Sequence, residues 1–124
     1  MPPPKLTPTE LQDALKTLPE WAEVGEAIQR TYQFKDFVAA MAFVDEVAKY
    51  AEAAQHHPDI MIRYSRVTLT VSTHDSGGIT QNDVDLAKKG DQIAANIPWP
   101  QPMPGSGAPP VVEVVKEKDV GKKK

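Results

Sequence analysis

The chain of 124 residues contains three histidines, and two of them, His56 and His57, stand side by side before Pro58. The third is His74. An imidazole has an ordinary pKa of about 6.5, so near neutral pH it both donates and accepts protons. Two imidazoles in one site repel each other when both are charged, which leaves at least one neutral as a base. Acid–base assistance contributes a factor of about 100 to 10,000, which suits proton transfer on a small molecule better than a very slow hydrolysis.

The elements around these histidines predict that all three meet. Residues 59–64 and 66–73 look like two strands around a turn near Ser65, because apolar and polar residues alternate in the second of them. A hairpin of that length brings its two outer ends together. The histidine pair and His74 are therefore expected to be neighbours in space.

Two alternative interpretations of the histidines stay open. A histidine at the C-terminal end of a helix often binds the last carbonyl groups and interacts favourably with the helix dipole. Three histidines could also bind a metal ion. Adjacent histidines do not chelate readily from one backbone direction, and Asp59 and Asp75 are equally well explained as turn residues. Proton transfer in a shared cleft is therefore the favoured hypothesis, and no metal site is predicted.

Three helices are predicted from their start signals. The expected N-cap residues are Thr7, Asp36 and Thr80. Glu10 and Asp83 stand three positions after two of these caps, where a carboxylate completes a capping box. The middle helix is expected to run over residues 37–55. Two further strands, at 21–24 and 27–34, are expected between the first two helices.

The expected order of elements is α-β-β-α-β-β-α, and the short links between consecutive strands imply antiparallel pairs. We therefore expect an α+β fold of two layers, in which a four-stranded antiparallel sheet carries the helices on one face. Val67, Leu69 and Val71 are expected to face the core. The long helix is expected to pack on the sheet through Phe37, Ala40, Met41, Val44, Val47, Ala48 and Ala51. Tyr32 and Phe34 lie on a strand of mixed polarity, which is expected either to be half exposed or to lie at a contact between subunits. The apolar surface of the long helix is a second candidate for such a contact.

Composition limits the class of protein. Hydrophobic residues make up 40% of the chain and charged residues 25%, which is ordinary for one globular domain. The net charge of −3 offers no broad basic surface for nucleic acid, and no apolar run is long enough for a membrane span. The lack of cysteine fits a reducing compartment, and the N-terminus has no apolar secretory core. We expect a cytoplasmic protein that binds neither nucleic acid nor membrane.

The folded domain is expected to span residues 5–99. Residues 1–4 are expected to be a disordered N-terminus. Residues 100–124 begin with a proline-rich stretch, which continues neither a helix nor the interior of a sheet, and end in lysines. We expect this segment to be a linker and tail that are mobile.

A set of fixed spacings resembles the signature of the pterin-4a-carbinolamine dehydratase family. The matching residues are Glu52, His56, His57, Pro58, Tyr64, His74 and Asp83, and the similarity extends over most of residues 5–97. The resemblance implies an enzyme that dehydrates 4a-hydroxytetrahydropterin, the product of aromatic amino acid hydroxylases, to quinonoid dihydropterin. It also implies that no metal or organic cofactor takes part. The expected setting is tetrahydrobiopterin recycling.

The resemblance also assigns roles to single residues. His56 is expected to be the general acid, His74 its acid–base counterpart, and His57 the member of the site that mainly holds the substrate. The expected pterin-binding positions are Gln55, His56, His57, Pro58, Ser72, Thr73, His74 and Asp75. Glu52 and Asp83 are expected to orient the other groups.

Two departures from the family leave the preferred pterin open. Ile60 stands where animal members often have an aromatic residue, and Ser76 where they often have a cysteine. Family members are dimers or tetramers, so a homodimer or homotetramer is expected, with an aromatic amino acid hydroxylase in the same pathway. Animal relatives also stabilise dimers of a homeodomain transcription factor. A protein-binding scaffold on the same fold is therefore the alternative to an enzyme.

Overall fold

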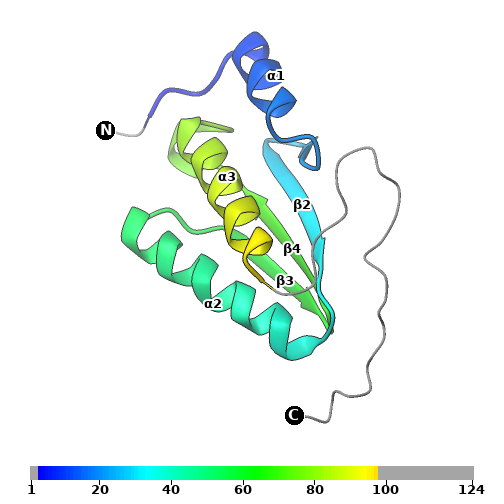
Figure 1. Cartoon of the computed structure of the whole chain (residues 1–124). Coiled ribbons are helices and arrows are strands. Elements are labelled where there is room, and N and C mark those ends of the chain that lie inside the picture. The colour runs from blue at the N-terminus through cyan, green and yellow to red at the C-terminus, as the bar shows by residue number, and fades with distance from the viewer. Residues whose placement is uncertain (1–2, 98–124) are drawn as a thin grey trace.

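The computed structural model describes residues 3–97, so the expected linker and lysine-rich tail lie outside the described residues, as do residues 1–2. The helices are α1 (Pro8–Lys16), α2 (Phe37–Ala54) and α3 (Gln81–Ala95), and the strands are β1 (Ala22–Val24), β2 (Ala27–Gln33), β3 (Asp59–Arg63) and β4 (Arg66–Val71). A turn of 3-10 helix, η1 (His74–Ser76), lies between β4 and α3. The predicted order of helices and strands is confirmed (Figure 1). Within residues 3–97 no helix is both long and apolar enough to span a membrane.

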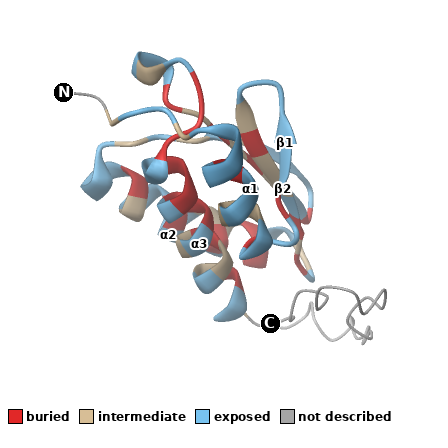
Figure 2. Cartoon of the chain, turned by 90° about the horizontal axis from the view of Figure 1, so that it is seen from above, coloured by how far each residue is buried: buried red, intermediate tan, exposed pale blue. Residues whose placement is uncertain are grey.

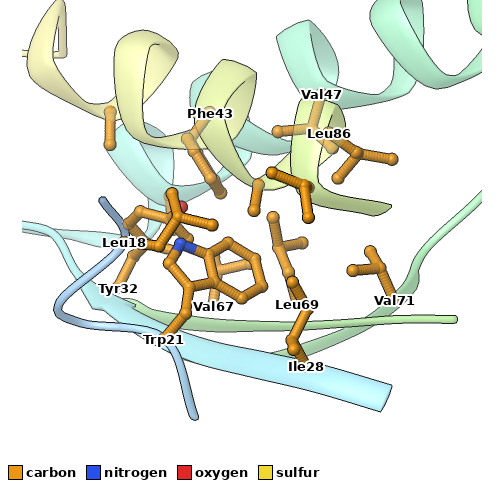
Figure 3. Close-up of a cluster of buried hydrophobic side chains, with 14 of the residues drawn as sticks. Leu18, Trp21, Ile28, Tyr32, Phe43, Val47, Val67, Leu69, Val71 and Leu86 are labelled. Atoms are coloured by element: carbon orange, nitrogen blue, oxygen red, sulfur yellow. The ribbon is translucent and has the colours of Figure 1, made fainter. Parts of the chain in front are cut away.

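The four strands form one antiparallel sheet in the order β1-β2-β4-β3. The helices α2 and α3 lie against one face of this sheet, and Figure 3 shows side chains of β2 and β4 pointing towards them. The expected two-layer α+β architecture is therefore confirmed. The register places Thr70 opposite both Gln29 and Asp59, so the first residue of β3 lies beside the C-terminal end of β4.

Local hydrogen bonds start the helices where the sequence predicts. Thr7 Oγ1 accepts from the Glu10 amide at 3.1 Å, while the Glu10 carboxylate accepts from the Thr7 amide at 2.8 Å. At the start of α2, Asp36 accepts from the Ala39 amide at 2.8 Å. Each cap satisfies amides that the first turn of a helix leaves without a backbone partner, so these short polar motifs determine where α1 and α2 begin.

The core lies between the helices and the inner face of the sheet, whereas β1 is exposed (Figure 2). Val67, Leu69 and Val71 of β4 are buried, as their alternation predicts. Tyr32 and Phe34 are also buried, with 0% and 1% of their surface exposed. The expectation that these two aromatic residues lie at a subunit contact is therefore wrong.

Arg30 is the reason why the inner face of β2 looks half polar in the sequence. Its guanidinium donates to Asp91 Oδ1 at 2.8 Å and lies 4.3 Å from the centre of the Tyr32 ring. The Tyr32 hydroxyl, at 2.5 Å, and Trp21 Nε1, at 3.0 Å, donate to the same carboxylate oxygen. Because Asp91, 61 positions later, pairs this charge, Arg30 shares the inner face of β2 with the buried residues Ile28 and Tyr32.

The inward face of α2 differs from the predicted stripe. Its buried residues are Ala39, Ala40, Phe43, Val47 and Ala51. Phe43 was not in the stripe, yet its ring centre lies 4.6 Å from that of Tyr32, whereas Phe37 is 47% exposed. Ala48 is exposed as well. Residues 37–44 are all apolar, so hydrophobic spacing does not define which side of this half of α2 faces the sheet.

Candidate active site

The end of α2 determines the position of His56. Gln55 adopts the left-handed conformation, with φ 55° and ψ 40°. Its amide donates to the Glu52 carbonyl at 3.3 Å, and the His56 amide donates to the Ala51 carbonyl at 3.0 Å. These are the two bonds of a Schellman helix end. Because they stop the helix and turn the chain, His56 leaves α2 in a defined direction.

The imidazole of His56 lies against a buried carboxylate. His56 Nε2 is 2.5 Å from Asp83 Oδ1. The Asp83 side chain is 0% exposed and that of His56 is 14% exposed. An ionised carboxylate only accepts hydrogen bonds, so the proton of this contact belongs to Nε2. Nδ1 is then the ring nitrogen left to exchange a proton with another group.

Asp83 stands at the third position of α3 and receives two further donors. The amide of Thr80, the N-cap of α3, donates to Asp83 Oδ2 at 2.8 Å, and so does the Thr73 hydroxyl at 2.8 Å. Three donors at two oxygens satisfy the buried carboxylate and hold its orientation towards His56. The helix dipole also favours a negative charge in this first turn. The predicted capping box is confirmed, and its carboxylate contacts His56 as well.

His57 faces a different carboxylate. Its Nε2 is 2.8 Å from Glu52 Oε2, and the two side chains are 60% and 70% exposed. A pair this exposed contributes little to stability, but it orients the ring. The Gln55 side chain donates to the Glu52 carbonyl at 2.8 Å, and Pro58 is half-buried just before β3. These residues lie at the C-terminal end of α2 and in the link from α2 to β3.

His74 opens the turn η1 directly after Thr73. The Thr73 amide donates to the Gly78 carbonyl at 2.9 Å, and the Gly78 amide donates back to the Thr73 carbonyl at 3.3 Å. Gly77 within this loop has a φ of 76°, which favours glycine. The loop holds the His74 side chain in an exposed position, where it has no hydrogen-bond partner among residues 3–97.

The other predicted pterin contacts near η1 differ in their surroundings. Ser72 is half-buried and donates its hydroxyl to the Glu26 carbonyl at 2.7 Å. Asp75 is exposed. Ser76 donates its hydroxyl to the Pro3 carbonyl, which ties the N-terminal segment to this loop. Asp75 and His74 therefore face solvent, while the two serines have protein partners.

The segments that carry the three histidines lie at one end of the sheet, where β3 begins and β4 ends. His56, Asp83 and Thr73 form one hydrogen-bonded chain, and His74 follows Thr73 directly. This arrangement agrees with the expectation that the outer ends of the hairpin meet. Tyr64, the aromatic residue of the signature, lies in the turn at the opposite end of the hairpin and is 69% exposed, so it stands apart from the histidines.

Two hollows among residues 3–97 are lined by residues other than the histidines. One, of about 330 Å³, lies beside α1 and the β1–β2 turn, and another, of about 580 Å³, lies between α2 and α3. None of the three histidines lines either of them. In the described range 3–97, no three or more His, Asp or Glu side chains are grouped as a metal site would require.

Residues 4–93 match the family model described as pterin 4 alpha carbinolamine dehydratase. The chain belongs to the pterin-4α-carbinolamine dehydratase family. A relative from Koribacter versatilis, named provisionally as such a dehydratase, is 57% identical over 88 residues, which are 71% of this chain and 94% of that one. A relative from Picosynechococcus with the same provisional name is 51% identical over 89 residues, or 72% of this chain and 97% of that one.

Two solved structures place this dehydratase-family chain among known folds. A transcriptional coactivator/pterin dehydratase from Brucella melitensis matches with a TM-score of 0.71 and 41% identity, over 73% of this chain and 98% of that one. A pterin dehydratase-like protein described as a RuBisCO assembly factor of the alpha-carboxysome matches with a TM-score of 0.53 and 23% identity. That match covers 60% of this chain and 89% of the other, and it shows the fold alone.

The sequence did not indicate the hydrogen-bonding roles of two hydroxyl groups in this dehydratase-family site. Thr73 is expected only as a pterin contact and Thr80 only as a helix cap. In the structure the Thr73 hydroxyl donates to Asp83, and the Thr80 hydroxyl contacts the Thr73 hydroxyl. The capping pattern was the available signal for Thr80. No pattern indicates that a hydroxyl ten positions before Asp83 points at the same carboxylate.

Proposed function

We propose that this chain is a 4a-hydroxytetrahydropterin dehydratase, which removes water to give quinonoid dihydropterin. The C4a–O bond breaks, the hydroxyl takes up a proton and leaves as water, and N5 loses its proton as the C4a–N5 double bond forms. One proton enters and one leaves, so the reaction needs an acid and a base but no redox partner. Imidazoles suit both tasks near neutral pH. The proposed source of the substrate is an aromatic amino acid hydroxylase, within tetrahydropterin recycling.

The contact between His56 and Asp83 carries this proposal. Asp83 holds the Nε2 proton of His56, so Nδ1 is the atom that delivers a proton to the leaving hydroxyl. When the ring carries both protons, its positive charge faces a carboxylate at 2.5 Å. His56 is thus the general acid, and Asp83 is its positioning residue.

His74 is the proposed counterpart that accepts the N5 proton. Its exposed ring has no hydrogen-bond partner within residues 3–97, which leaves both ring nitrogens free for a substrate. His57, held by Glu52, is the proposed residue that mainly binds the pterin. The further proposed contacts are Gln55, Pro58, Ser72 and Asp75. Proton exchange of both catalytic rings with water resets the site after each turnover.

Stopped-flow mixing with freshly generated 4a-hydroxytetrahydropterin tests the proposed activity. His56→Ala is expected to lower kcat by about 100-fold or more, because general acid–base assistance is worth about that much. Lys88→Ala is a matched control, since Lys88 is exposed on α3. It is expected to keep the wild-type rate. A His56→Ala chain that folds and turns over at the wild-type rate would refute the assignment.

Association of identical subunits is a second part of the proposal. Phe37 and Val38, in the first turn of α2, are 47% and 77% exposed. Adjacent exposed apolar side chains are common where subunits associate. We expect a homodimer or homotetramer in sedimentation equilibrium, and a smaller species for Val38→Lys. A wild-type chain that sediments as a monomer would contradict this expectation.

Protein binding on the same fold is the second candidate function. The coactivator name of the Brucella relative and the exposed apolar pair on α2 favour it. Complementation of cells that lack this chain distinguishes the two functions. If His56→Ala restores their phenotype as well as the wild-type chain does, the scaffold role accounts for it; if only wild type does, the enzyme role does.

A further inference from the structure

Thr73 lies between the two histidines that are proposed to move protons. It directly precedes His74, and it is 8% exposed. Its hydroxyl oxygen is 2.8 Å from Asp83 Oδ2 and 2.8 Å from Thr80 Oγ1. A hydroxyl this buried with two protein partners is committed to the fold, so it is not available to bind a pterin.

The direction of each hydroxyl proton follows from the number of donors. A threonine hydroxyl carries one proton, and an ionised carboxylate only accepts, so the proton of Thr73 points at Asp83. The contact between the two hydroxyls is then a donation from Thr80 to Thr73. Thr80 Oγ1 in turn accepts from the Asn82 amide at 3.2 Å. The chain runs from Thr80 through Thr73 to Asp83, and each donation strengthens the next.

The backbone of Thr73 closes the loop that carries His74. Its amide donates to the Gly78 carbonyl at 2.9 Å. Its carbonyl accepts from the Ser76 amide at 3.0 Å and from the Gly78 amide at 3.3 Å. The side chain of Thr73 therefore binds the carboxylate that holds His56, while its backbone anchors the turn that presents His74.

From these contacts we propose that Thr73 is a positioning residue that couples the two acid–base histidines. Its hydroxyl holds Asp83 against Nε2 of His56, and its backbone places His74 beside that pair. This inference rests on the dehydratase function proposed above. Thr73 sets the geometry between acid and base and does not touch the reacting atoms.

Variants that keep or remove the hydroxyl test this role. Thr73→Val keeps the shape of the side chain and is expected to lower kcat about tenfold, equivalent to about 1.4 kcal/mol, and to shift the pH profile of kcat. KM is expected to stay within about twofold, because Thr73 does not bind the pterin. Thr73→Ser restores most of kcat. Thr68→Val is the matched control, since Thr68 lies on β4 and its hydroxyl bonds Thr31 at 2.8 Å on the outer face of the sheet.

A double variant shows whether Thr73 acts through Asp83. Thr73→Val is expected to cause no further loss of kcat in a chain that already carries Asp83→Asn. A residue with a merely structural role would lower the unfolding temperature and leave kcat and its pH profile unchanged in the folded chain. Wild-type kcat in Thr73→Val, or a full additional loss in the double variant, would overturn the proposal.

Nitrogen-15 spectra of the imidazole rings make the test independent of turnover. In the wild-type chain His56 is expected to carry its neutral-form proton on Nε2, and Thr73→Val is expected to populate the Nδ1 tautomer. If this shift occurs but wild type shows no turnover, the dehydratase function fails and the positioning role stands. If wild type turns over and neither the tautomer nor kcat changes in the variant, the positioning role fails. Thr73→Ala repeats the test if the valine variant does not fold.

Discussion

Asp83→Asn changes the charge of one buried side chain and almost nothing of its shape. The carboxylate is 0% exposed and accepts from the Thr73 hydroxyl and the Thr80 amide at Oδ2, and from His56 Nε2 at Oδ1. The two donors at Oδ2 require an oxygen there, so the new amide nitrogen takes the place of Oδ1. Two N–H groups cannot face each other across this contact, so His56 must move its proton to Nδ1.

The size of the effect follows from what this change removes. The hydrogen bonds at the retained oxygen persist, and the bond between His56 and a charged carboxylate is replaced by one between two neutral groups, so the free energy of unfolding is expected to fall by about 1–1.5 kcal/mol. kcat is expected to fall by about 100-fold or more, because His56 is held in the wrong tautomer and its protonated ring no longer faces a carboxylate.

Urea unfolding and stopped-flow dehydration measure the two quantities on the same preparation. Asp85→Asn is the matched control, because Asp85 is exposed two positions further along α3 and accepts from the Gln81 side chain at 2.9 Å. It is expected to change stability by less than about 0.5 kcal/mol and to keep wild-type kcat. If Asp83→Asn retains wild-type kcat across the pH range, the reasoning about His56 is refuted.

Three further predictions concern one core residue, Tyr32, and two residues at the end of α2, Gln55 and His57. Burial, reinforced by the Asp91 carboxylate, raises the pKa of Tyr32 above its ordinary value. Above about pH 10 the Tyr32 hydroxyl loses its proton in the unfolded chain but keeps it in the folded chain, so the free energy of unfolding falls by about 1.4 kcal/mol per pH unit. Urea unfolding at pH 9–11 should show this fall, and Tyr32→Phe should make the pH dependence flatter. Gln55→Gly relieves a left-handed conformation and is expected to raise the free energy of unfolding by about 1 kcal/mol, whereas a decrease in urea unfolding would mean that the Gln55 side-chain bond outweighs the strain. His57→Ala is expected to raise KM about tenfold with a smaller change in kcat, and an equal loss in kcat would instead place His57 in proton transfer.

Features that depend on neighbours along the chain were predictable from the sequence. Thr80 and Asp83 lie within one helical turn, so their spacing alone predicts the capping box that the structure contains. Val67, Leu69 and Val71 alternate with polar residues, so they had to share the buried face of a strand.

Features that depend on contacts between distant segments were not predictable in the same way. Arg30 makes the inner face of β2 look polar in the sequence, and Tyr32 was therefore assigned to a subunit contact. The sequence does not show that Asp91, which pairs with Arg30, comes from α3. Residues 37–44 are apolar without interruption, so the sequence does not define which side of α2 faces the sheet. Both errors concern packing partners that become neighbours only in the folded chain.

The candidate site was predictable in outline. The hairpin indicated that the histidines share one edge, and the structure places Asp83 against His56 and Glu52 against His57. Which carboxylate serves which ring depends on how α3 docks beside the end of α2. The direction of the Thr73 hydroxyl depends on that docking and on the turn that ends β4, so no local pattern indicates it.

The single-turnover rate of dehydration in His74→Ala tests the central claim most directly, because the exposed ring of His74 is the proposed catalytic group that the fold constrains least. We expect His74→Ala and His56→Ala each to slow this step by about 100-fold or more. The double variant is expected to leave only the uncatalysed rate. A wild-type rate in folded His74→Ala would contradict the account of two imidazoles that pass protons to and from one pterin.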